Sequence, residues 1–453
     1  MDGVEQSEPA PTPRRKPRLP WITALAVSFV VCVLATFRGG YVGPDYNTHL
    51  WRLMEWSKIF DFSTTNPPIY YLFGHVLLKI VGNNNGFLFT ISILQAAINT
   101  VALGWFALFI ENRFKSSVIH TALILFLAFL PVRMIHSTTL GTDCTTIPAF
   151  MVILGCLDKL LATQGFRLRN ALYLGAALTL AICLKYTFMA LLPIVSVIFI
   201  VLARKRAWGF RRFAAISLAG LLAATVFTLA SFWLSSRVHG YNTDKHWVKY
   251  SPTDSDMGYW EILSVRRADL VLFKAPQAFK EAVAPAHVHS YLGLCHMGIF
   301  TDPMNLFQVL REPQVFGFPL VPDLKERAGW KTPVMVASMS LGLIWTLFAL
   351  IGTAWALRRA VLNLAKGRLE REDSTILLGT AYFLLIFLAI PFVYGAALYG
   401  YWTPRLILPA IISFSLAAFL FIESKVAKRS NAIASWILFL VAVQCGIEIA
   451  MLA

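Results

Sequence analysis

Long apolar runs separated by short polar segments recur along almost the whole chain. We interpret eleven of them as helices that cross the membrane, and most have about the length needed for its roughly 30 Å hydrocarbon core. These runs cover residues 21–37, 87–110, 118–136, 145–161, 171–184, 186–203, 213–234, 333–357, 375–395, 405–422 and 431–452. The pattern predicts an all-α polytopic membrane protein with about 11 transmembrane helices (range about 10–13).

Residues 67–82 form a further apolar segment that we expect to lie along the membrane surface. The segment begins with two prolines, and His75 and Lys79 share one face of the helix it would form. If it crossed the membrane, the basic clusters 204–206 and 211–212 would lie outside, against the positive-inside rule. With the segment at the surface, the N-terminus and every short basic loop fall on the cytoplasmic side.

Composition supports a membrane protein. The chain is 57% hydrophobic and 14% charged, whereas soluble domains carry about 25% charged residues. Its mean hydropathy is +0.63. The net charge of +16 could suggest a nucleic-acid partner, but more than half of the 40 Lys and Arg residues fall in the short loops predicted to be inside. We therefore expect the charge to orient the chain among membrane lipids, with no nucleic acid as partner.

The pattern divides the chain into four parts. Residues 1–20 are basic and proline-rich and are predicted to be a disordered cytoplasmic tail; residues 21–234 are predicted to be an N-terminal transmembrane module, with an external loop at 38–86. Residues 235–332 are predicted to form a large external loop, and 333–453 the C-terminal transmembrane helices. A non-membrane segment as long as 235–332 is typical of a lid or binding loop. Most of the six cysteines lie in predicted spans, where they fill apolar space; only Cys144 and Cys295 fall outside, so they are the one pair that could cross-link.

Asp45 follows the first predicted span, and His49 stands one helical turn after it. One interpretation of Asp45 is an N-cap for the amphipathic stretch that follows. The other is a general base or metal ligand at the mouth of a membrane cavity, because a carboxylate near hydrocarbon becomes more basic. His49 could share a metal, orient the base or contact substrate, or be a plain interfacial histidine.

Asp143 is the second acid, in a polar break between the third and fourth predicted spans. It could cap the next helix or act in catalysis. That helix has only about a dozen apolar residues before Asp158, which is short of the membrane thickness at about 1.5 Å per residue. Helix 171–184 is similarly short and ends at Lys185. We expect both helix ends to lie below the membrane surface and to line a cavity.

Three basic residues are candidates for binding a lipid-linked phosphate. Lys185 lies between two apolar helices, where an ammonium group costs several kcal/mol unless it reaches the lipid headgroups or meets an anion. Arg405 opens a span from the outside, where the positive-inside rule disfavours it. Arg133, in the segment Arg133-Met134-Ile135-His136, is the third and weaker candidate.

The stretch 291–302 in the large loop is dense in aromatic and polar groups and contains His296 and Asp302. It could be a packed part of the loop, or a lid in which aromatic faces and the His/Asp pair hold sugar hydroxyls. The chain shows no nucleotide-phosphate loop, no His-Glu-x-x-His motif and no dinucleotide fingerprint. Because ATP is absent outside the cell, chemistry on that face would need a substrate that is already activated.

The ordered motifs resemble those of the GT-C glycosyltransferases, in particular the branch of protein O-mannosyltransferases and lipid A aminoarabinose transferases. The resemblance rests on four elements in order, with Lys185-Tyr186-Thr187 at the family's basic position between paired helices. The four elements are Asp45; Asn66-Pro67-Pro68-Ile69-Tyr70-Tyr71; Asp143; and Pro404-Arg405 through Leu408-Pro409-Ala410.

The resemblance implies a hexosyl- or pentosyltransferase that takes a sugar from a polyprenyl-phosphate donor to an acceptor glycan, lipid or protein on the external face. Asp45 would be the base of an inverting displacement, with Tyr70 near the sugar or acceptor. Many family members have two adjacent acids in the first loop, whereas Tyr46 follows Asp45 here. This departure weakens the argument for a divalent cation (Mg or Mn) held by Asp45 and Asp143. The resemblance therefore assigns no cofactor with certainty.

Two other functions stay open at this stage. One is a secondary transporter or lipid flippase, although the chain has no internal repeat and its candidate residues gather at one face. The other is a non-catalytic assembly factor of the cell envelope. The long external loop lacks an Asn-x-Ser/Thr acceptor sequence, which favours a bacterial inner membrane as the location.

Overall fold

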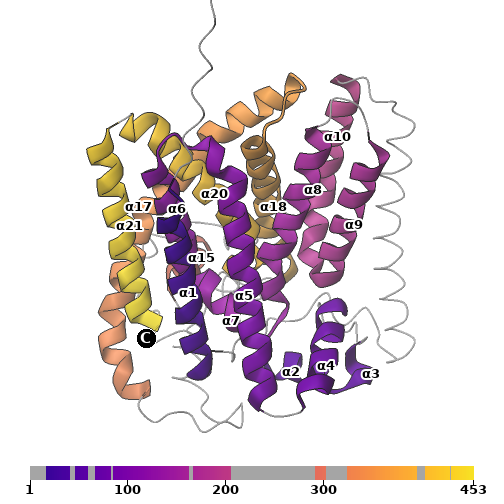
Figure 1. The fold of residues 1–453 in the computed structure, drawn as a ribbon, viewed down its shortest axis with the longest axis vertical. Coiled ribbons are helices and arrows are strands. Elements are labelled where there is room, and N and C mark those ends of the chain that lie inside the picture. Colours follow the sequence, from indigo (N-terminus) through magenta and orange to yellow (C-terminus); the bar gives the residue numbers. More distant parts are fainter. Residues whose placement is uncertain are drawn as a thin grey trace, which may run out of the picture.

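Helices account for the secondary structure in this computed structural model, with no strand among the residues it describes. These residues are 17–40, 46–59, 67–82, 85–162, 167–205, 291–301, 324–394, 403–428 and 430–452. Figure 1 shows most of the helices running roughly side by side between two ends of the molecule. The fold class predicted from the apolar pattern is confirmed: the chain is an all-α polytopic membrane protein.

The N-terminal half contributes ten α-helices. They are α1 (Leu19–Phe37), α2 (Tyr46–Met54), α3 (Trp56–Ile59), α4 (Ile69–Val81), α5 (Asn85–Ile110), α6 (Ser117–Phe129), α7 (Pro131–Thr138), α8 (Thr146–Leu161), α9 (Leu168–Leu184) and α10 (Leu191–Lys205). Three 3-10 turns connect them: η1 (Glu111–Arg113), η2 (Thr142–Thr145) and η3 (Tyr186–Ala190). The C-terminal half contributes α15 (Tyr291–Phe300), α17 (Leu324–Ala365), α18 (Arg371–Tyr394), α19 (Thr403–Leu406), α20 (Leu408–Phe421), the π-helical turn η7 (Ile422–Ala427) and α21 (Asn431–Leu452).

Ten of the eleven predicted spans correspond to helices in the described residues, and the eleventh, 213–234, lies outside them. Eight of these helices are long and apolar enough to cross a membrane. A ninth candidate is the pair α6 and α7, which bends by 50° at Leu130. Pro131 explains the break, because proline has no backbone N–H to donate to the preceding turn. The predicted span 171–184 corresponds to α9, which at 17 residues is short for a crossing.

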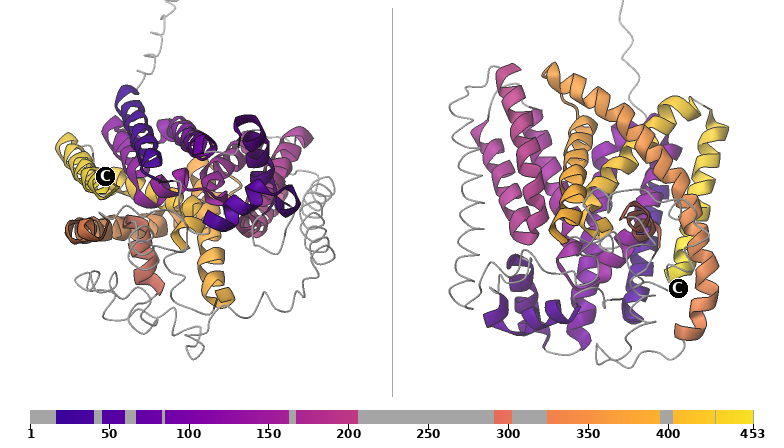
Figure 2. Two further views of the ribbon diagram at one scale, coloured as in Figure 1. Left: turned by 90° about the horizontal axis from the view of Figure 1, so that it is seen from below. Right: turned by 180° about the vertical axis from the view of Figure 1, so that it is seen from behind.

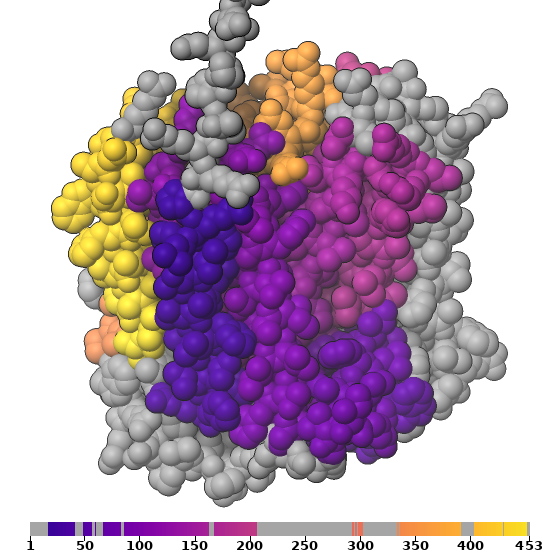
Figure 3. Space-filling model, viewed as in Figure 1, coloured from indigo at the N-terminus to yellow at the C-terminus, as the bar shows by residue number. Residues whose placement is uncertain are grey.

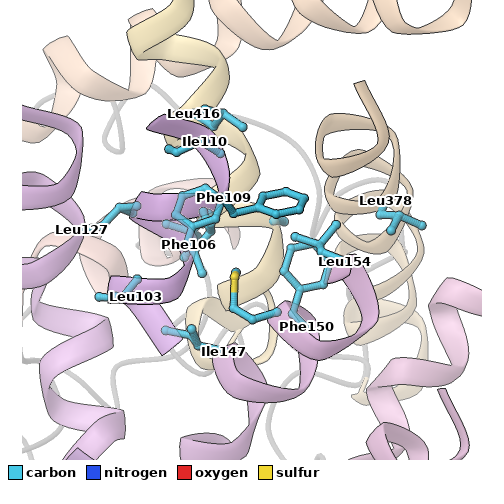
Figure 4. Packing of buried hydrophobic residues seen from close by; sticks show 14 of the residues in the cluster. Leu103, Phe106, Phe109, Ile110, Leu127, Ile147, Phe150, Leu154, Leu378 and Leu416 are labelled. Carbon is cyan, nitrogen blue, oxygen red and sulfur yellow. The ribbon is translucent and has the colours of Figure 1, made fainter. Parts of the chain in front are cut away.

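Both halves share one apolar core. Helix α21 packs against α6, and α20 packs against both α6 and α8. Figure 4 shows Phe106 and Phe109 of α5 facing Phe150 and Leu154 of α8, with Leu378 and Leu416 from the C-terminal half nearby. Residues 21–234 and 333–453 are therefore separate parts only along the sequence. The described helices of the two parts pack together as one body.

The outer surface of the bundle is apolar, as a lipid-facing surface must be. On α1, Ile22, Val30 and Leu34 are exposed, and α17 exposes Leu347 and Leu350. Figure 3 shows α1 lying between α5 and the C-terminal α21 on one face. From behind, Figure 2 shows α8, α9 and α10 at one side of the bundle and α17 with α21 at the other.

One end of the bundle, the upper end in Figure 1, carries a network of ion pairs. Arg18 binds Glu111 at 2.7 Å, Arg113 binds Glu372 at 2.9 Å, and Arg371 binds Asp158 at 2.9 Å. The sequence assigned Arg18, Arg113 and Arg371 to the cytoplasmic loops. The structure gathers them at one end, as the predicted alternation of spans requires.

The opposite end, the lower end in Figure 1, holds α2, α3 and α4, while α7 and α15 lie nearer the middle of the bundle. Helix α4 is the segment predicted to lie at the surface; it has 13 residues and packs against α2. Cys144 and Cys295 are both free thiols. Of the large loop 235–332, the structure describes α15 with Thr301 and the first turns of α17; the rest lies outside the described residues.

Candidate functional site

Three side chains from separate segments of the chain converge in the lower half of the bundle, around the carboxylate of Asp143. The Lys185 ammonium contacts Oδ1 of Asp143. The Arg405 Nη1 lies 3.5 Å from Oδ2, and the His136 Nδ1 lies 3.9 Å from the same oxygen. Their side chains are between 5% and 16% exposed. We call these four residues the Asp143 cluster; it brings together two cations and one carboxylate away from bulk water.

Each member of the cluster stands where a helix is short or broken. His136 belongs to α7, just after the bend at Leu130. Lys185 has an extended backbone between α9 and η3, and Arg405 belongs to the four-residue α19. Interrupted helices leave polar backbone inside a membrane protein only where protein or a cavity surrounds it. The interruptions in the apolar pattern therefore mark the positions from which the charged side chains reach one another.

The turn that carries Asp143 is held in place by hydrogen bonds from neighbouring helices. The Gly141 N–H donates to the Tyr70 hydroxyl at 3.0 Å, and Asn99 Nδ2 donates to the Cys144 carbonyl at 2.8 Å. The Thr146 hydroxyl donates to the backbone carbonyl of Asp143 at 2.7 Å. Helices α4, α5 and α8 thus fix the backbone of η2, so the position of the carboxylate depends on Tyr70 and Asn99.

Tyr70 contacts the backbone of the turn that carries Asp143. Its hydroxyl accepts hydrogen bonds from Gly141 and from Gln95 Nε2, the latter at 2.7 Å. Burial raises the pKa of Tyr70 well above its ordinary value, so the phenol stays neutral at physiological pH. The predicted contact with sugar or acceptor is untested, and the observed contacts support a positioning role for Tyr70.

Replacing Tyr70 with Phe is expected to destabilise the protein and to lower its activity. The change leaves two buried donors, Gly141 N and Gln95 Nε2, without their acceptor, at about 1–3 kcal/mol for each unpaired group. Thermal unfolding in detergent and the rate of donor consumption measure the two effects. Tyr173→Phe is the matched control, because Tyr173 on α9 is 51% exposed. Equal behaviour of the two variants would contradict the positioning role.

His49 also packs against the turn that carries Asp143. Its Nδ1 lies 2.6 Å from the Tyr71 hydroxyl, and the two rings stack at 5.8 Å between centroids. A Cβ added at Gly141 would lie 2.9 Å from the His49 Nε2, so the imidazole fits only because residue 141 is glycine. His49 therefore links α2 to the loop of Asp143.

Of the remaining predicted residues, the structure describes His296 and Arg133. His296 on α15 hydrogen-bonds Thr346 Oγ1 at 3.2 Å through Nδ1 and the Met339 carbonyl at 3.1 Å through Nε2. Burial lowers the pKa of His296, which favours the neutral ring. Helix α15 packs against α7 and α19, the elements that carry His136 and Arg405. Asp45 and Asp302 lie outside the described residues.

Arg133 is buried in a different place from the Asp143 cluster. Its Nη1 donates to Ser28 Oγ at 2.7 Å and to the Ala128 carbonyl at 2.8 Å, and Nη2 donates to Thr100 Oγ1 at 3.2 Å. The Ala128 carbonyl lies at the end of α6, next to the bend. These contacts support a structural role at the helix break, and the predicted role in phosphate binding stays without support.

Two residues of this region were not singled out from the sequence. His136 stands three residues after Arg133, on the segment noted for its basic residues, but the sequence gives no reason to prefer it. Arg52 on α2 is fully buried and stacks its guanidinium 4.0 Å above the Tyr71 ring. Its position in a loop predicted to be external, against the positive-inside rule, could have drawn attention to it as it did to Arg405.

A divalent cation at this site is untested. Among the residues that the structure describes, no group of three His, Cys, Asp or Glu side chains is placed to hold a metal. Both oxygens of Asp143 face cationic or imidazole groups. A metal ligated by Asp143 would compete with Lys185 and Arg405 for the same carboxylate, while Asp45 lies outside the described residues.

Comparison with known proteins gives a distant likeness. No family model and no curated protein sequence matches this chain. It is similar to crystal structures of ArnT from Cupriavidus metallidurans, one bound to undecaprenyl phosphate and one in the apo state. Sequence identity is 15% and 14%, the match covers 90% and 89% of this chain and 78% and 76% of the ArnT chains, and the TM-score is 0.37 for both.

ArnT is a GT-C lipid A aminoarabinose transferase, which belongs to the branch that the ordered motifs of this chain resemble. A TM-score of 0.37 does not by itself establish a shared fold or a shared activity. The residues of the Asp143 cluster therefore have to carry any functional assignment.

Proposed function

We propose that this protein is a membrane glycosyltransferase that moves a hexose or pentose from a polyprenyl-phosphate-linked donor to an acceptor hydroxyl at the external, periplasmic face. The observation that carries the proposal is the pairing of Lys185 and Arg405 around one carboxylate, at the end of the bundle opposite the basic loops. Two buried cations in a water-poor site are suited to stabilising the charge that develops on a departing phosphate.

The reaction is a direct displacement at the anomeric carbon. Asp45 accepts the proton of the acceptor hydroxyl, whose oxygen forms the new glycosidic bond with inversion. The bond from the sugar to the phosphate oxygen breaks, and the electron pair leaves on the polyprenyl phosphate beside Lys185 and Arg405. Because the donor is already activated, the reaction needs no nucleotide at the external face.

The topology follows from the same proposal. The end that carries Arg18, Arg113 and Arg371 faces the cytoplasm by the positive-inside rule, and the Asp143 cluster faces the periplasm of a bacterial inner membrane. A polyprenyl chain would remain in the lipid while its phosphate reaches the protein. The acceptor can be a glycan, a lipid or a protein.

The test compares lipid-linked sugars and envelope glycans in strains with and without the gene, by mass spectrometry. The proposal expects one polyprenyl-phosphate sugar to accumulate in the deletion strain, while the same sugar disappears from one envelope component. Wild-type protein restores both pools, and the Asp45→Asn variant restores neither. If neither pool changes on deletion, the chain is not this transferase, and a non-catalytic assembly factor becomes the better account.

A secondary transporter or lipid flippase would give a different result. Such a protein would move a substrate across vesicles that contain purified protein, and no glycosidic bond would form. Movement without a product would support the transporter in place of the enzyme.

A further inference from the structure

The carboxylate of Asp143 lies between the same cations that the proposed reaction assigns to the donor phosphate. We propose that the Asp143 carboxylate lies in the position where the phosphate of the lipid-linked donor binds, and that the phosphate replaces it there on binding. This inference rests on the proposed function, and it adds a step to it: an exchange of carboxylate for phosphate that precedes sugar transfer.

The geometry of the contacts supports the exchange. Lys185 contacts Oδ1, while Arg405 Nη1 and His136 Nδ1 lie 3.5 and 3.9 Å from Oδ2. Three groups from separate elements thus converge on one anion that presents two oxygens. A phosphate also presents adjacent anionic oxygens. Lysine and arginine can each bind either a phosphate or a carboxylate.

Burial makes simultaneous binding of both anions unfavourable. The side chains of Asp143, Lys185 and Arg405 are 12%, 5% and 16% exposed. With little water to screen the charges, a phosphate placed against the same two cations would repel the carboxylate. One anion therefore has to give way to the other.

Only the side chain of Asp143 needs to move in the exchange. Its backbone carbonyl accepts the Thr146 hydroxyl, and the flanking residues Gly141 and Cys144 are tied to Tyr70 and Asn99. Rotation about the side-chain bonds can release the carboxylate while η2 stays in place. The released carboxylate is then available to orient the sugar or the acceptor.

The exchange also explains why an acid stands beside two cations that have to bind an anion. Uncompensated cations inside a membrane protein are costly. In the absence of donor, Asp143 compensates Lys185 and Arg405, and the donor phosphate takes over this function when it binds.

The direction of one affinity change tests the exchange. Binding of decyl phosphate to the purified full-length chain in detergent is measured by calorimetry for the wild type and for Asp143→Asn. The exchange predicts that the variant binds decyl phosphate about tenfold more tightly or better, because the competing carboxylate is gone. If Asp143 instead holds the cations in position for phosphate, the variant binds more weakly, and equal or weaker binding overturns the inference.

Controls separate this inference from the proposed function and from misfolding. Asp158→Asn removes an aspartate paired with an arginine at the opposite end of the bundle and is expected to leave the affinity unchanged. Asp143→Ser is the second variant, and the rise in unfolding temperature with decyl phosphate shows binding by each folded sample. A wild-type chain that binds no decyl phosphate contradicts both proposals, whereas wild-type binding without tightening in folded Asp143→Asn contradicts the exchange alone. Asp143→Ser takes its place if Asp143→Asn does not fold.

Inorganic phosphate distinguishes two sources of the ligand. Weaker binding of inorganic phosphate than of decyl phosphate, with tightening of the latter, supports a lipid-linked phosphate. Equal binding and equal tightening of both would keep the exchange and would assign free phosphate as the ligand, against the proposed donor.

Discussion

Replacing Lys185 with Met is expected to lower the rate of sugar transfer about 10²–10³-fold, the size of effect seen when one preorganised charge-stabilising group is lost. The ammonium contacts the Asp143 carboxylate in a buried site, where the departing phosphate would also be stabilised. Methionine keeps the length and apolar character of the side chain but removes its charge. Initial rates of donor consumption measure the effect.

Stability has to be separated from catalysis in this variant, because loss of one partner leaves a buried carboxylate with fewer cations around it. The double variant Lys185→Met with Asp143→Asn removes both charges and is expected to recover unfolding temperature without recovering activity. Lys79→Met is the control for a general loss of positive charge, since Lys79 is exposed on α4. A Lys185→Met variant that turns over at the wild-type rate would contradict the assigned role.

Replacing Asp45 with Asn is expected to reduce transfer about 10²–10⁴-fold while the protein remains folded, because the amide cannot accept the proton of the acceptor hydroxyl. Asp45 itself lies outside the described residues. His49, four residues later, packs against Gly141, which precedes Asp143 by two positions. That contact places α2, which begins one residue after Asp45, against the turn of Asp143, and this supports a shared site.

The measurement is the rate of product formation with donor and acceptor held at saturating concentrations. Glu55→Gln is the matched control in the same loop, because Glu55 is exposed and a glutamine oxygen can still accept from Trp51 Nε1. Near-normal turnover by Asp45→Asn, with the unfolding temperature unchanged, would remove Asp45 as the base and leave His136 or Asp143 to be considered.

Much of the architecture could be predicted from the apolar pattern. Apolar length alone places most of the spans, and the basic residues Arg18, Arg113 and Arg371 predict which helix ends lie together, because charge is excluded from the hydrocarbon core. The bend between α6 and α7 was not predicted, although Pro131 marks it. The sequence predicts a single helix over residues 118–136, whereas the structure has two helices there, α6 and α7.

The candidate site could be predicted only in part. Lys185, Arg405 and Asp143 attract attention because charge at an external or intramembrane position has an energetic cost, and the structure brings the three together. The same reasoning pointed to Arg133, whose guanidinium hydrogen-bonds within the helix break, and its predicted role in phosphate binding stays untested. Whether a costly charge meets a ligand or a carbonyl depends on tertiary packing, which a single sequence does not encode locally.

Neutral positioning residues escaped the sequence analysis for a related reason. Asn99 and Gln95 are polar residues within an apolar helix, but nothing in the sequence indicates that they reach Cys144 and Tyr70. His136 becomes a candidate only when the bend directs α7 towards Asp143. These partners are separated in sequence, so only the packed bundle reveals them.

The most direct test of the central claim is a one-to-one accounting of product and carrier. Purified protein is incubated with the lipid-linked sugar that accumulates in the deletion strain and with acceptor membranes from that strain, and mass spectrometry quantifies both products. The account predicts one free polyprenyl phosphate for each sugar joined to the acceptor, with both lost in Lys185→Met. Donor that crosses the membrane intact, with no polyprenyl phosphate released, would contradict it.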